Sequence, residues 1–441
     1  MKLIESGNVF PRLEKHFPTQ YLVVKSPRKD KFLVFLSPFA FILYPLKMLP
    51  RKKILALILA GGAGGRLGLL TEKRAKPVMP FAGFYRLIDF ALSNCLHSGV
   101  SDVWVIEQYE LHTLNEHLSN GRPWDLDRTY GGLQVLPPFE RNGKKSGDKG
   151  GFAEGNADAI FRHLELIEEF SPDILIVLSA DHVYKFDFRD AIQTHLEKKA
   201  ALTMVTTRLP EGENASRFGV VETSRNGRVT NFEYKPEKPK NDLITTEIFV
   251  YEARVLIETL KKLKETKDEI KDYGHELIPF LVEQGNVFEH RLNGYWRDVG
   301  TIKSYWQSQI DLLDERAKFI FDDERWRILT LAPQVVPAFI YGSADVKNSL
   351  VAQGCRVYGK VSRSVLSSGV TIEKGSEVKD SIVLPRAIIE KGVKIERVIV
   401  DAGVKVTREK MKKIEAARGR DKNAIIVVGK YKVQSQKEIE E

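Results

Sequence analysis

Cysteine is scarce in this chain, which has two in 441 residues, Cys95 and Cys355. Two cysteines in different predicted domains give neither a disulfide framework nor the paired spacing of a metal site. Because this usage suits a reducing compartment, we expect a cytoplasmic protein.

Long apolar runs are also missing from the N-terminal region. Its apolar stretch, residues 32–46, is shorter than the roughly 20 residues that a spanning helix needs, and Pro38 and Pro45 interrupt it. Basic residues precede the stretch as in a signal peptide, but no small-residue cleavage site follows. A weak interfacial anchor stays open as an alternative, and we expect no stable membrane insertion.

Positive charge is concentrated in one segment. The formal net charge is +9, and residues 1–53 carry eleven Lys or Arg against three Asp or Glu. The remaining chain is therefore close to neutral. This distribution implies no basic face and argues against a nucleic-acid partner.

The most informative segment is ILALILAGGAGGRL, which begins at Ile54. Its apolar start is typical of a buried parallel strand, and its glycines let backbone N–H groups approach a ligand closely. Arg66 and Lys76 bring two cations to the same strand end, so the segment predicts a polyphosphate site. The P-loop pattern GxxxxGK[ST] is absent, and the glycines alone could form an ordinary strand-to-helix turn.

The next part of the chain alternates between strand-like and helix-like segments. The expected strands are 102–108, 173–180, 202–207 and 248–251, and the expected helices are 157–169 and 255–264. This order predicts an α/β fold with a mostly parallel sheet. Ligands bind such sheets at the carboxyl ends of the strands, where Gly61, Gly62 and Asp181 lie.

A six-residue period follows from about residue 348. It is carried by Leu366, Ile372, Val378 and Leu384, by Val383, Ile389 and Ile395, and by Gly369 and Gly375. Such short repeats predict a parallel β-helix, although a sandwich could imitate two or three of the matches. We expect residues 407–422 to be helical or loose and residues 424–428 to form a last short strand.

Several motifs together resemble those of the sugar nucleotidyltransferases. LAGGxGxRL is followed by RAKP, and the continuation YRLIDFALSNC narrows the resemblance to the glucose-1-phosphate adenylyltransferase family. Further matches are QY at 108–109, RPWDL at 122–126, ADHVY at 180–184 and YWRDVGT at 295–301. The resemblance implies a Rossmann-like nucleotidyltransferase domain at 54–325 and a left-handed β-helix of hexapeptide repeats at 326–441. Residues 1–53 are then a basic and apolar extension, with Met48 as an alternative start.

The resemblance also implies a reaction. ATP and glucose 1-phosphate would give ADP-glucose and pyrophosphate, for α-glucan synthesis of the glycogen or starch type. Arg66, Lys76 and Asp181 would be catalytic, with the two cations facing the triphosphate. Asp181 and Asp298 would hold Mg²⁺. The plainer alternatives are exposed surface cations, a turn cap at Asp181 and an ion pair between Asp298 and Arg297.

Binding roles come from the same resemblance. The nucleotide-binding residues would be Leu59, Ala60, Gly61, Gly62, Gly64, Arg66, Lys76 and Gln108. The sugar-phosphate-binding residues would be Gly219, Tyr234, Lys235 and Thr245. His182 is expected to make a structural hydrogen bond rather than to bind a ligand.

The sugar side departs from the family pattern. Tyr234 stands where the family has Glu, Thr245 where it has Ser, and Glu247 where it has Gly. The residues around Ala153 differ from the family string as well. A missing hydroxyl acceptor can cost roughly 10⁴-fold in discrimination, so another sugar 1-phosphate remains an alternative substrate.

Two further alternatives concern regulation and assembly. Phe84 replaces a lysine at which effectors of the family bind, so altered or absent allosteric control is expected. The resemblance implies a homo-oligomer, namely a tetramer. The alternative is a hetero-oligomer with a homologue, in which this chain is a non-catalytic or weakly catalytic regulatory subunit. An acyltransferase with a histidine base in the repeat domain is disfavoured, because no histidine follows His290.

Overall fold

The computed structural model describes residues 20–25, 31–36, 52–62, 64–138, 153, 155–210, 213–266, 272–314 and 319–440. Two compact units divide the chain, Met1–Pro50 and Arg51–Glu441. In the first unit, β1 (Gln20–Lys25) and β2 (Lys31–Leu36) form an antiparallel pair. The alternative start Met48 lies outside the described residues. None of the helices in the described ranges has the length and apolar character that crossing a bilayer requires.

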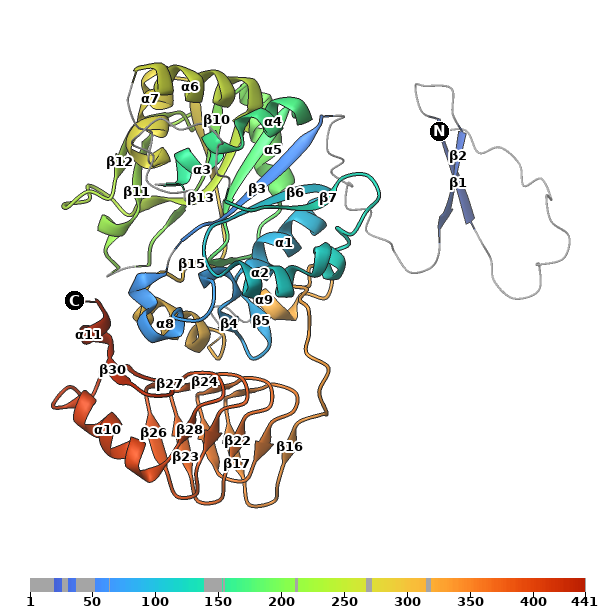
Figure 1. Cartoon of the computed structure of the whole chain (residues 1–441). Helices are drawn as coiled ribbons and strands as arrows, with labels where there is room; N and C mark the ends of the chain where they lie inside the picture. Colours follow the sequence, from blue (N-terminus) through green and yellow to red (C-terminus); the bar gives the residue numbers. More distant parts are fainter. Residues whose placement is uncertain are drawn as a thin grey trace, which may run out of the picture. The chain divides into compact units, whose positions relative to one another are not determined.

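The second unit begins with a nine-stranded sheet (Figure 1). Its strands are β3 (Ile54–Ala60), β6 (Asp102–Glu107), β7 (Gly132–Leu136), β8 (Ile174–Ser179), β10 (Leu202–Arg208), β11 (Gly219–Thr223), β12 (Val229–Tyr234), β13 (Leu243–Glu252) and β14 (Val287–Arg291). The run β8-β3-β6-β7, which ends at the sheet edge, is parallel throughout. The predicted parallel core is thereby confirmed, and β13 joins it antiparallel to β8 and β10.

Helices and short elements surround this sheet. The helices are α1 (Ile88–His97), α2 (Leu111–Leu118), α3 (Asn156–Arg162), α4 (Leu164–Phe170), α5 (Phe188–Lys198), α6 (Ala253–Thr266), α7 (Ile278–Glu283), α8 (Ile302–Asp311) and α9 (Phe319–Asp322), with a π-helical turn at Tyr273–Leu277. Short strand pairs are β4 (Pro80–Phe81) with β5 (Tyr85–Arg86), and β9 (His182–Tyr184) with β15 (Trp296–Asp298).

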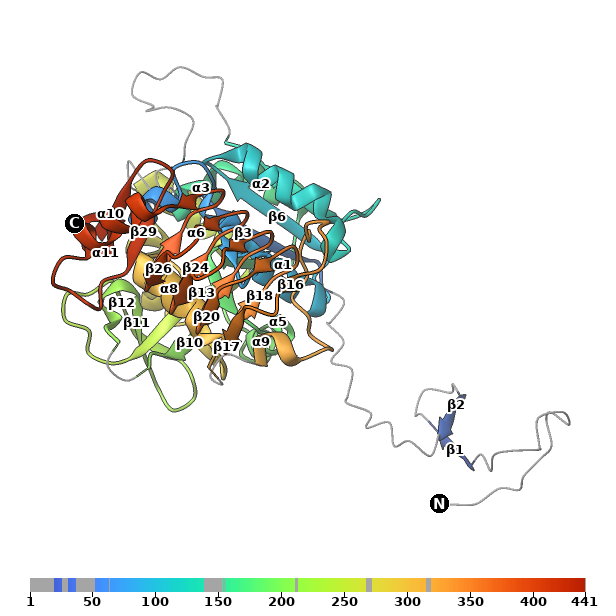
Figure 2. The same cartoon turned by 90° about the horizontal axis from the view of Figure 1, so that it is seen from below.

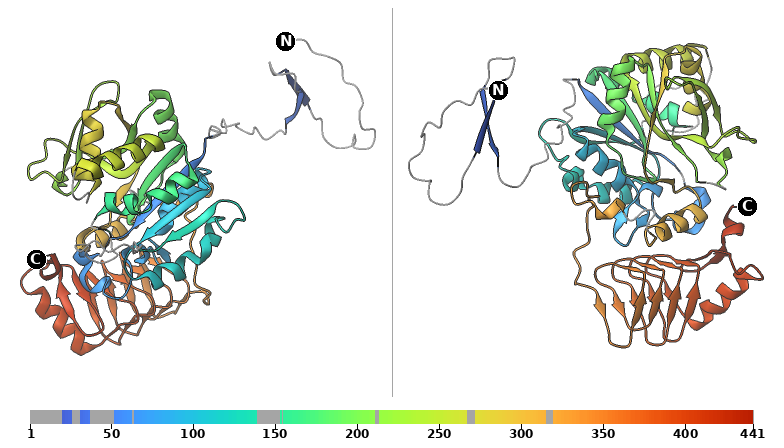
Figure 3. Two further views of the ribbon diagram at one scale, coloured as in Figure 1. Left: turned by 45° about the horizontal axis from the view of Figure 1, so that its top comes forward. Right: turned by 180° about the vertical axis from the view of Figure 1, so that it is seen from behind.

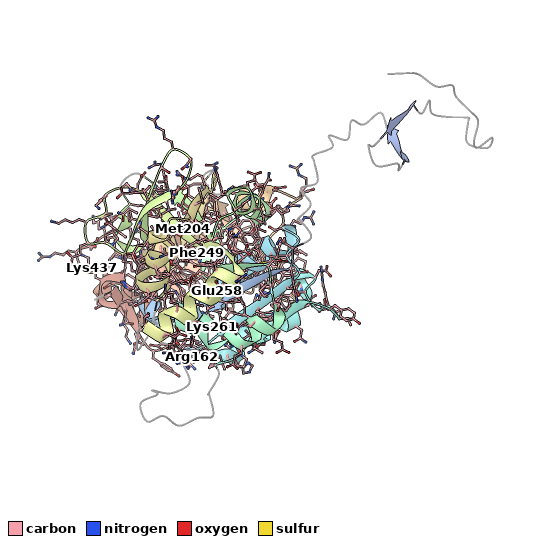
Figure 4. The ribbon with its side chains drawn as sticks, turned by 90° about the horizontal axis from the view of Figure 1, so that it is seen from above. Arg162, Met204, Phe249, Glu258, Lys261 and Lys437 are labelled. Atoms are coloured by element: carbon pink, nitrogen blue, oxygen red, sulfur yellow. The ribbon has the colours of Figure 1, made fainter. Side chains whose placement is uncertain are left out.

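Packing explains why the strands carry continuous apolar runs. Met204 of β10 and Phe249 of β13 are register partners, and both are fully buried (Figure 4). A sheet covered on both faces has no polar side to alternate with, so its central strands are apolar at nearly every position.

Two expectations need correction. The single helix expected over residues 157–169 is two helices, α3 and α4, because His163 between them has a non-helical backbone. The strand expected at 248–251 extends over Leu243–Glu252 and contains an irregularity opposite Val205 and Thr206.

The predicted β-helix follows, as three columns of parallel strands (Figure 2). They comprise β16 (Phe339–Ile340), β19 (Arg356–Val357), β22 (Thr371–Ile372), β25 (Ile388–Ile389) and β28 (Lys405–Val406); β17 (Asp345–Lys347), β20 (Lys360–Ser362), β23 (Glu377–Lys379) and β26 (Lys394–Glu396); and β18 (Leu350–Val351), β21 (Val365–Leu366), β24 (Ile382–Val383), β27 (Val398–Val400) and β29 (Ile426–Val428). The chain ends with α10 (Arg408–Arg418), β30 (Val433–Ser435), which pairs with β29, and α11 (Gln436–Glu440).

The length of a coil corrects the six-residue period. Leu366 pairs with Val383 and Ile372 with Ile389, which is a repeat of 17 residues in the central coils. The six-residue period aligned Leu384 with Leu366, but the structure aligns Val383 with Leu366, one position earlier. Its side chain is fully buried, but it belongs to the core between the β-helix and the sheet domain.

That shared core joins the two parts of the second unit. It contains Leu67, Phe90 and Tyr305 from the first part and Leu384 and Ile399 from the β-helix. A hydrogen bond of 2.8 Å from the Trp306 indole to the Asp380 carbonyl crosses the same boundary. The β-helix is thus packed against the domain that carries the sheet.

Candidate active site

A cavity of about 460 Å³ lies at the carboxyl ends of β3 and β8. It is lined by the glycine turn after β3 (Gly62, Gly64, Gly65), by Lys76, by the segment Ser179–His182, and by side chains from β12, β13 and β15. The volume is in the usual range for a small-molecule site. The sequence analysis predicted the ligand site at this same edge of the sheet.

Gly64 gives the turn after β3 its shape. Its φ is +68°, and a Cβ there would lie 2.9 Å from the Thr71 Cγ2 atom. Gly61 has a different reason to be glycine, since a Cβ there would lie 3.0 Å from the side chain of Gln108. Gln108 is buried beside the turn. The turn therefore keeps its backbone open toward the cavity.

Lys76 lies between two carboxylates. Its ammonium forms an ion pair with Asp181 and lies 4.0 Å from an Asp298 oxygen. The other Asp298 oxygen accepts a 2.7 Å hydrogen bond from Arg217. The side chain of Lys76 is only 9% exposed, so the two acids supply most of its surroundings.

This arrangement keeps Lys76 and Asp181 charged. Burial alone would raise the pKa of Asp181, but the Lys76 ammonium and His182 outweigh it and hold that pKa well below its usual range. Burial alone would lower the pKa of Lys76, but Asp181 and Asp298 raise it instead. The pair is thus ionised at neutral pH.

Asp181, His182 and Asp298 place one ligand atom each within 4.8 Å of one another. The His182 Nδ1 lies 3.1 Å from the Thr246 carbonyl oxygen, the kind of structural contact expected for it. Two carboxylates beside open cavity space are the oxygen donors that Mg²⁺ prefers. The residues present therefore fit this ion.

A second wall of the cavity is aromatic and acidic. The Tyr234 hydroxyl donates a 3.0 Å hydrogen bond to Asp272, and its ring lies against Gly274, where a Cβ would meet the ring at 2.3 Å. Lys235 holds its ammonium 4.4 Å from the Tyr234 ring. Burial, followed by the nearby Asp272 and Glu247 carboxylates, raises the pKa of Tyr234, so its hydroxyl stays protonated.

Glu247 also lines this wall. One oxygen of its carboxylate lies 4.0 Å from the His182 Nε2, and the Tyr273 hydroxyl bonds to it. Burial is the main cause of a raised pKa for Glu247, and Asp181 and Asp298 add to it. A third carboxylate thus faces the same cavity as the two candidate metal ligands.

The structure brings most of the predicted residues to one cavity. Those that line it are Leu59, Ala60, Gly62, Gly64, Arg66, Lys76, Asp181, Tyr234, Lys235 and Asp298. Gly61 and Gln108 lie together behind the turn. Gly219 and Thr245 contact each other, and the Thr245 side chain is 2% exposed and faces the interior.

Sequence reasoning assigned no site role to several lining residues, among them Asn156, Arg217, Asp272 and Tyr273. Arg217 stands two residues before Gly219, which the sequence did single out. Asp272 and Tyr273 had no local signal, because they reach the cavity from the turn after α6. Their position depends on the packing of that turn against β12 and β13.

The fold and the cavity define a class of protein. A glycine turn with two cations lies beside paired carboxylates at the edge of a parallel sheet. This arrangement suits the transfer of a group from a polyphosphate to a second anionic substrate. The family described as nucleotidyl transferase matches residues 55–315, and the family described as GlmU-like, C-terminal hexapeptide, matches residues 336–428. The β-helix is thus consistent with the predicted left-handed form.

Curated relatives agree with both matches. A protein of Thermosipho africanus is 43% identical over 74% of this chain and 78% of its own. One from Clostridium novyi is 42% identical over 74% of this chain and 84% of its own, and one from Desulforamulus reducens is 41% identical over 78% and 86%. All three are named glucose-1-phosphate adenylyltransferase. The chain therefore belongs to the glucose-1-phosphate adenylyltransferase family and is a nucleotidyltransferase.

Proposed function

We propose that this enzyme transfers AMP from ATP to glucose 1-phosphate, releasing pyrophosphate and forming ADP-glucose. The observation that carries the proposal is the position of Lys76 between Asp181 and Asp298 in the cavity beside the glycine turn. The names of the relatives point to the same substrate.

Asp181 and Asp298 would hold Mg²⁺. When bound there, the ion would neutralise phosphate charge and act as a Lewis acid. Arg217 holds Asp298 in place through its 2.7 Å hydrogen bond. The Ser179 hydroxyl donates a hydrogen bond to the Asp181 carboxylate, and this bond fixes the orientation of the Asp181 side chain.

The remaining residues bind and align the two anions. Arg66, which is exposed, and Lys76 would bind triphosphate oxygens, and Lys235 would bind the sugar phosphate, since all three line the cavity. The backbone from Leu59 to Gly62, with Gln108 behind it, would hold the base. Alignment of this kind, with positive charge where the leaving pyrophosphate gains negative charge, supplies most of the rate in phosphate chemistry.

The test is pyrophosphate release by the purified protein with Mg²⁺ and ATP, across a panel of sugar 1-phosphates. Release with glucose 1-phosphate is the expected result, and removal of Mg²⁺ by EDTA should abolish it. Release with a different sugar alone would reassign the substrate. No release with any sugar or with GTP or UTP would favour a regulatory subunit instead.

The same proposal includes assembly through the β-helix. Among the described residues, six of the ten exposed large apolar side chains fall within residues 331–341. Phe339 and Ile340 form β16, which pairs on one side only, with β19, and lies at the end of the stack away from α10 (Figure 3). An open apolar edge strand favours pairing with another chain. We propose that a second copy covers it.

Light scattering tests this assembly. Phe339→Lys with Ile340→Lys should reduce the mass to that of a smaller species, whereas Tyr431→Lys, at a residue 80% exposed elsewhere, should not. An unchanged mass in the double variant would contradict the proposed interface.

Use in α-glucan synthesis, a cytoplasmic location and altered or absent control by sugar phosphates complete the proposal. The location is supported by two buried free thiols.

A further inference from the structure

Strand β13 contains a bulge at the cavity. Val205 of β10 is the register partner of Ile248, but its neighbour Thr206 is the partner of Thr245, so Thr246 and Glu247 have no register partners on β10. Bulges next to active sites change the direction of a side chain. Here the bulge places Glu247 in the lining of the cavity.

The backbone of Glu247 is in an unfavourable conformation. Its φ is +56°, a region that glycine adopts freely and a glutamate rarely does. Strained residues of this kind persist where the surrounding structure requires them and collect at functional sites. A glutamate kept at such a position needs a reason other than packing.

The neighbours of Glu247 indicate what its carboxylate meets. Tyr273 bonds to it, and Tyr234 lies in the same wall with its hydroxyl already bonded to Asp272. Among the described residues, Lys76 pairs with Asp181 and Lys235 lies 4.4 Å from the Tyr234 ring, and neither lysine pairs with Glu247. A carboxylate beside aromatic rings, with neither lysine on it, suits hydroxyl groups, which donate hydrogen bonds to it.

We propose that Glu247 accepts hydrogen bonds from the sugar hydroxyls and so determines which sugar 1-phosphate binds. This inference rests on the proposed function for its substrate class. A role as a metal ligand is less well supported, because Glu247 lies outside the compact group of Asp181, His182 and Asp298. A role in phosphate binding is opposed by its charge.

Three variants test the proposal in the full-length protein. Glu247→Gln removes the charge and keeps the shape, and Glu247→Gly removes the side chain and relieves the φ of +56°. Glu258→Gln, on the outer face of α6, is the matched control (Figure 4). For each we would measure KM for glucose 1-phosphate, KM for ATP and the Mg²⁺ concentration giving half-maximal rate, with the Kd of glucose 1-phosphate by calorimetry.

Both Glu247 variants should raise KM and Kd for glucose 1-phosphate about 10- to 100-fold, the value of a hydrogen bond to a charged group. KM for ATP and the Mg²⁺ requirement should stay within about twofold. Monodeoxy analogues of glucose 1-phosphate identify the hydroxyl involved. For the analogue that lacks the hydroxyl contacted by Glu247, Glu247→Gln should weaken binding little further. Glu247→Gly should unfold at the same temperature or higher, since glycine adopts this φ without strain.

Other outcomes overturn the inference or separate it from the proposed reaction. If sugar binding is unchanged in Glu247→Gln, or if the Mg²⁺ requirement rises by the same factor as KM for the sugar, the residue does not recognise the sugar. If wild type releases no pyrophosphate but binds glucose 1-phosphate, and Glu247→Gln loses that binding, the proposed reaction fails and the inference stands. If wild type shows neither release nor binding, both fail.

Discussion

Lys76 shows how one residue combines stability and chemistry. Its ammonium neutralises Asp181 and faces Asp298 while it lines a cavity beside the glycine turn. Its buried position excludes most water, which strengthens its interaction with any phosphate that enters. A substitution at Lys76 therefore affects both ligand binding and folding stability, so each variant needs a matched control.

Lys76→Met should lower kcat about 100-fold, as expected for the loss of a preorganised group facing a leaving phosphate. The measurement is steady-state pyrophosphate release at saturating ATP and sugar 1-phosphate. Lys73→Ala removes an exposed lysine three residues earlier and should leave the rate within about twofold. Equal losses in the two variants would mean that position 76 has no special role.

His195 gives the fold a dependence on pH. It is 1% exposed, its Nδ1 lies 3.1 Å from the Thr203 hydroxyl, and burial lowers its pKa to about 4 from an ordinary 6.5. The unfolded chain therefore takes up a proton before the folded one does. The contribution of neutral His195 to the free energy of unfolding should be fully present above pH 6.5. That free energy should fall by about 3 kcal/mol as the pH drops toward 4.

Urea unfolding at pH 7 and pH 5 measures this effect. His195→Gln should show a smaller loss between the two pH values than wild type. The exposed His112→Gln serves as the control and should keep the wild-type slope. A His195→Gln variant with the full wild-type slope would show that another group causes the dependence.

The turn after β3 is the element on which the site depends. Gly64→Ala should destabilise the fold by about 1–2 kcal/mol, because alanine is strained at a φ of +68° and its Cβ would meet Thr71 at 2.9 Å. Gly62→Ala, whose Cβ would meet nothing within 4 Å, should cost less than about 0.5 kcal/mol. Thermal and urea unfolding compare the two variants, and equal costs would contradict a special role for Gly64.

Elements with a strong local pattern were predicted well. β3, β6, β8 and β10 begin and end within two residues of the expected strands, because a buried strand needs a continuous apolar run. The break between α3 and α4 at His163 was missed, since nothing in the local composition marks it. The coil of 17 residues was missed because a period of six and one of slightly less than six look alike over a few repeats.

At the scale of the whole molecule, one core joins the sheet domain to the β-helix. Leu384→Ala removes a fully buried side chain from that core and should cost about 2–5 kcal/mol. Hydrogen exchange should then speed up both in β3 and in the β-helix, because the two share this core. Val336→Ala, 56% exposed, should change neither. Faster exchange in the β-helix alone would show that the two parts unfold independently.

The sequence by itself determined the class of protein and the strand that carries the glycine turn, because both follow from local patterns that residue order expresses. Its resemblance to a known family predicted Arg66, Lys76, Asp181 and Asp298 as site residues. The tertiary structure decided that Asp272 and Tyr273 reach the cavity, that Thr245 is buried, and that a bulge directs Glu247 into the cavity lining. Those outcomes depend on strand register and on packing between distant segments, which no local pattern records.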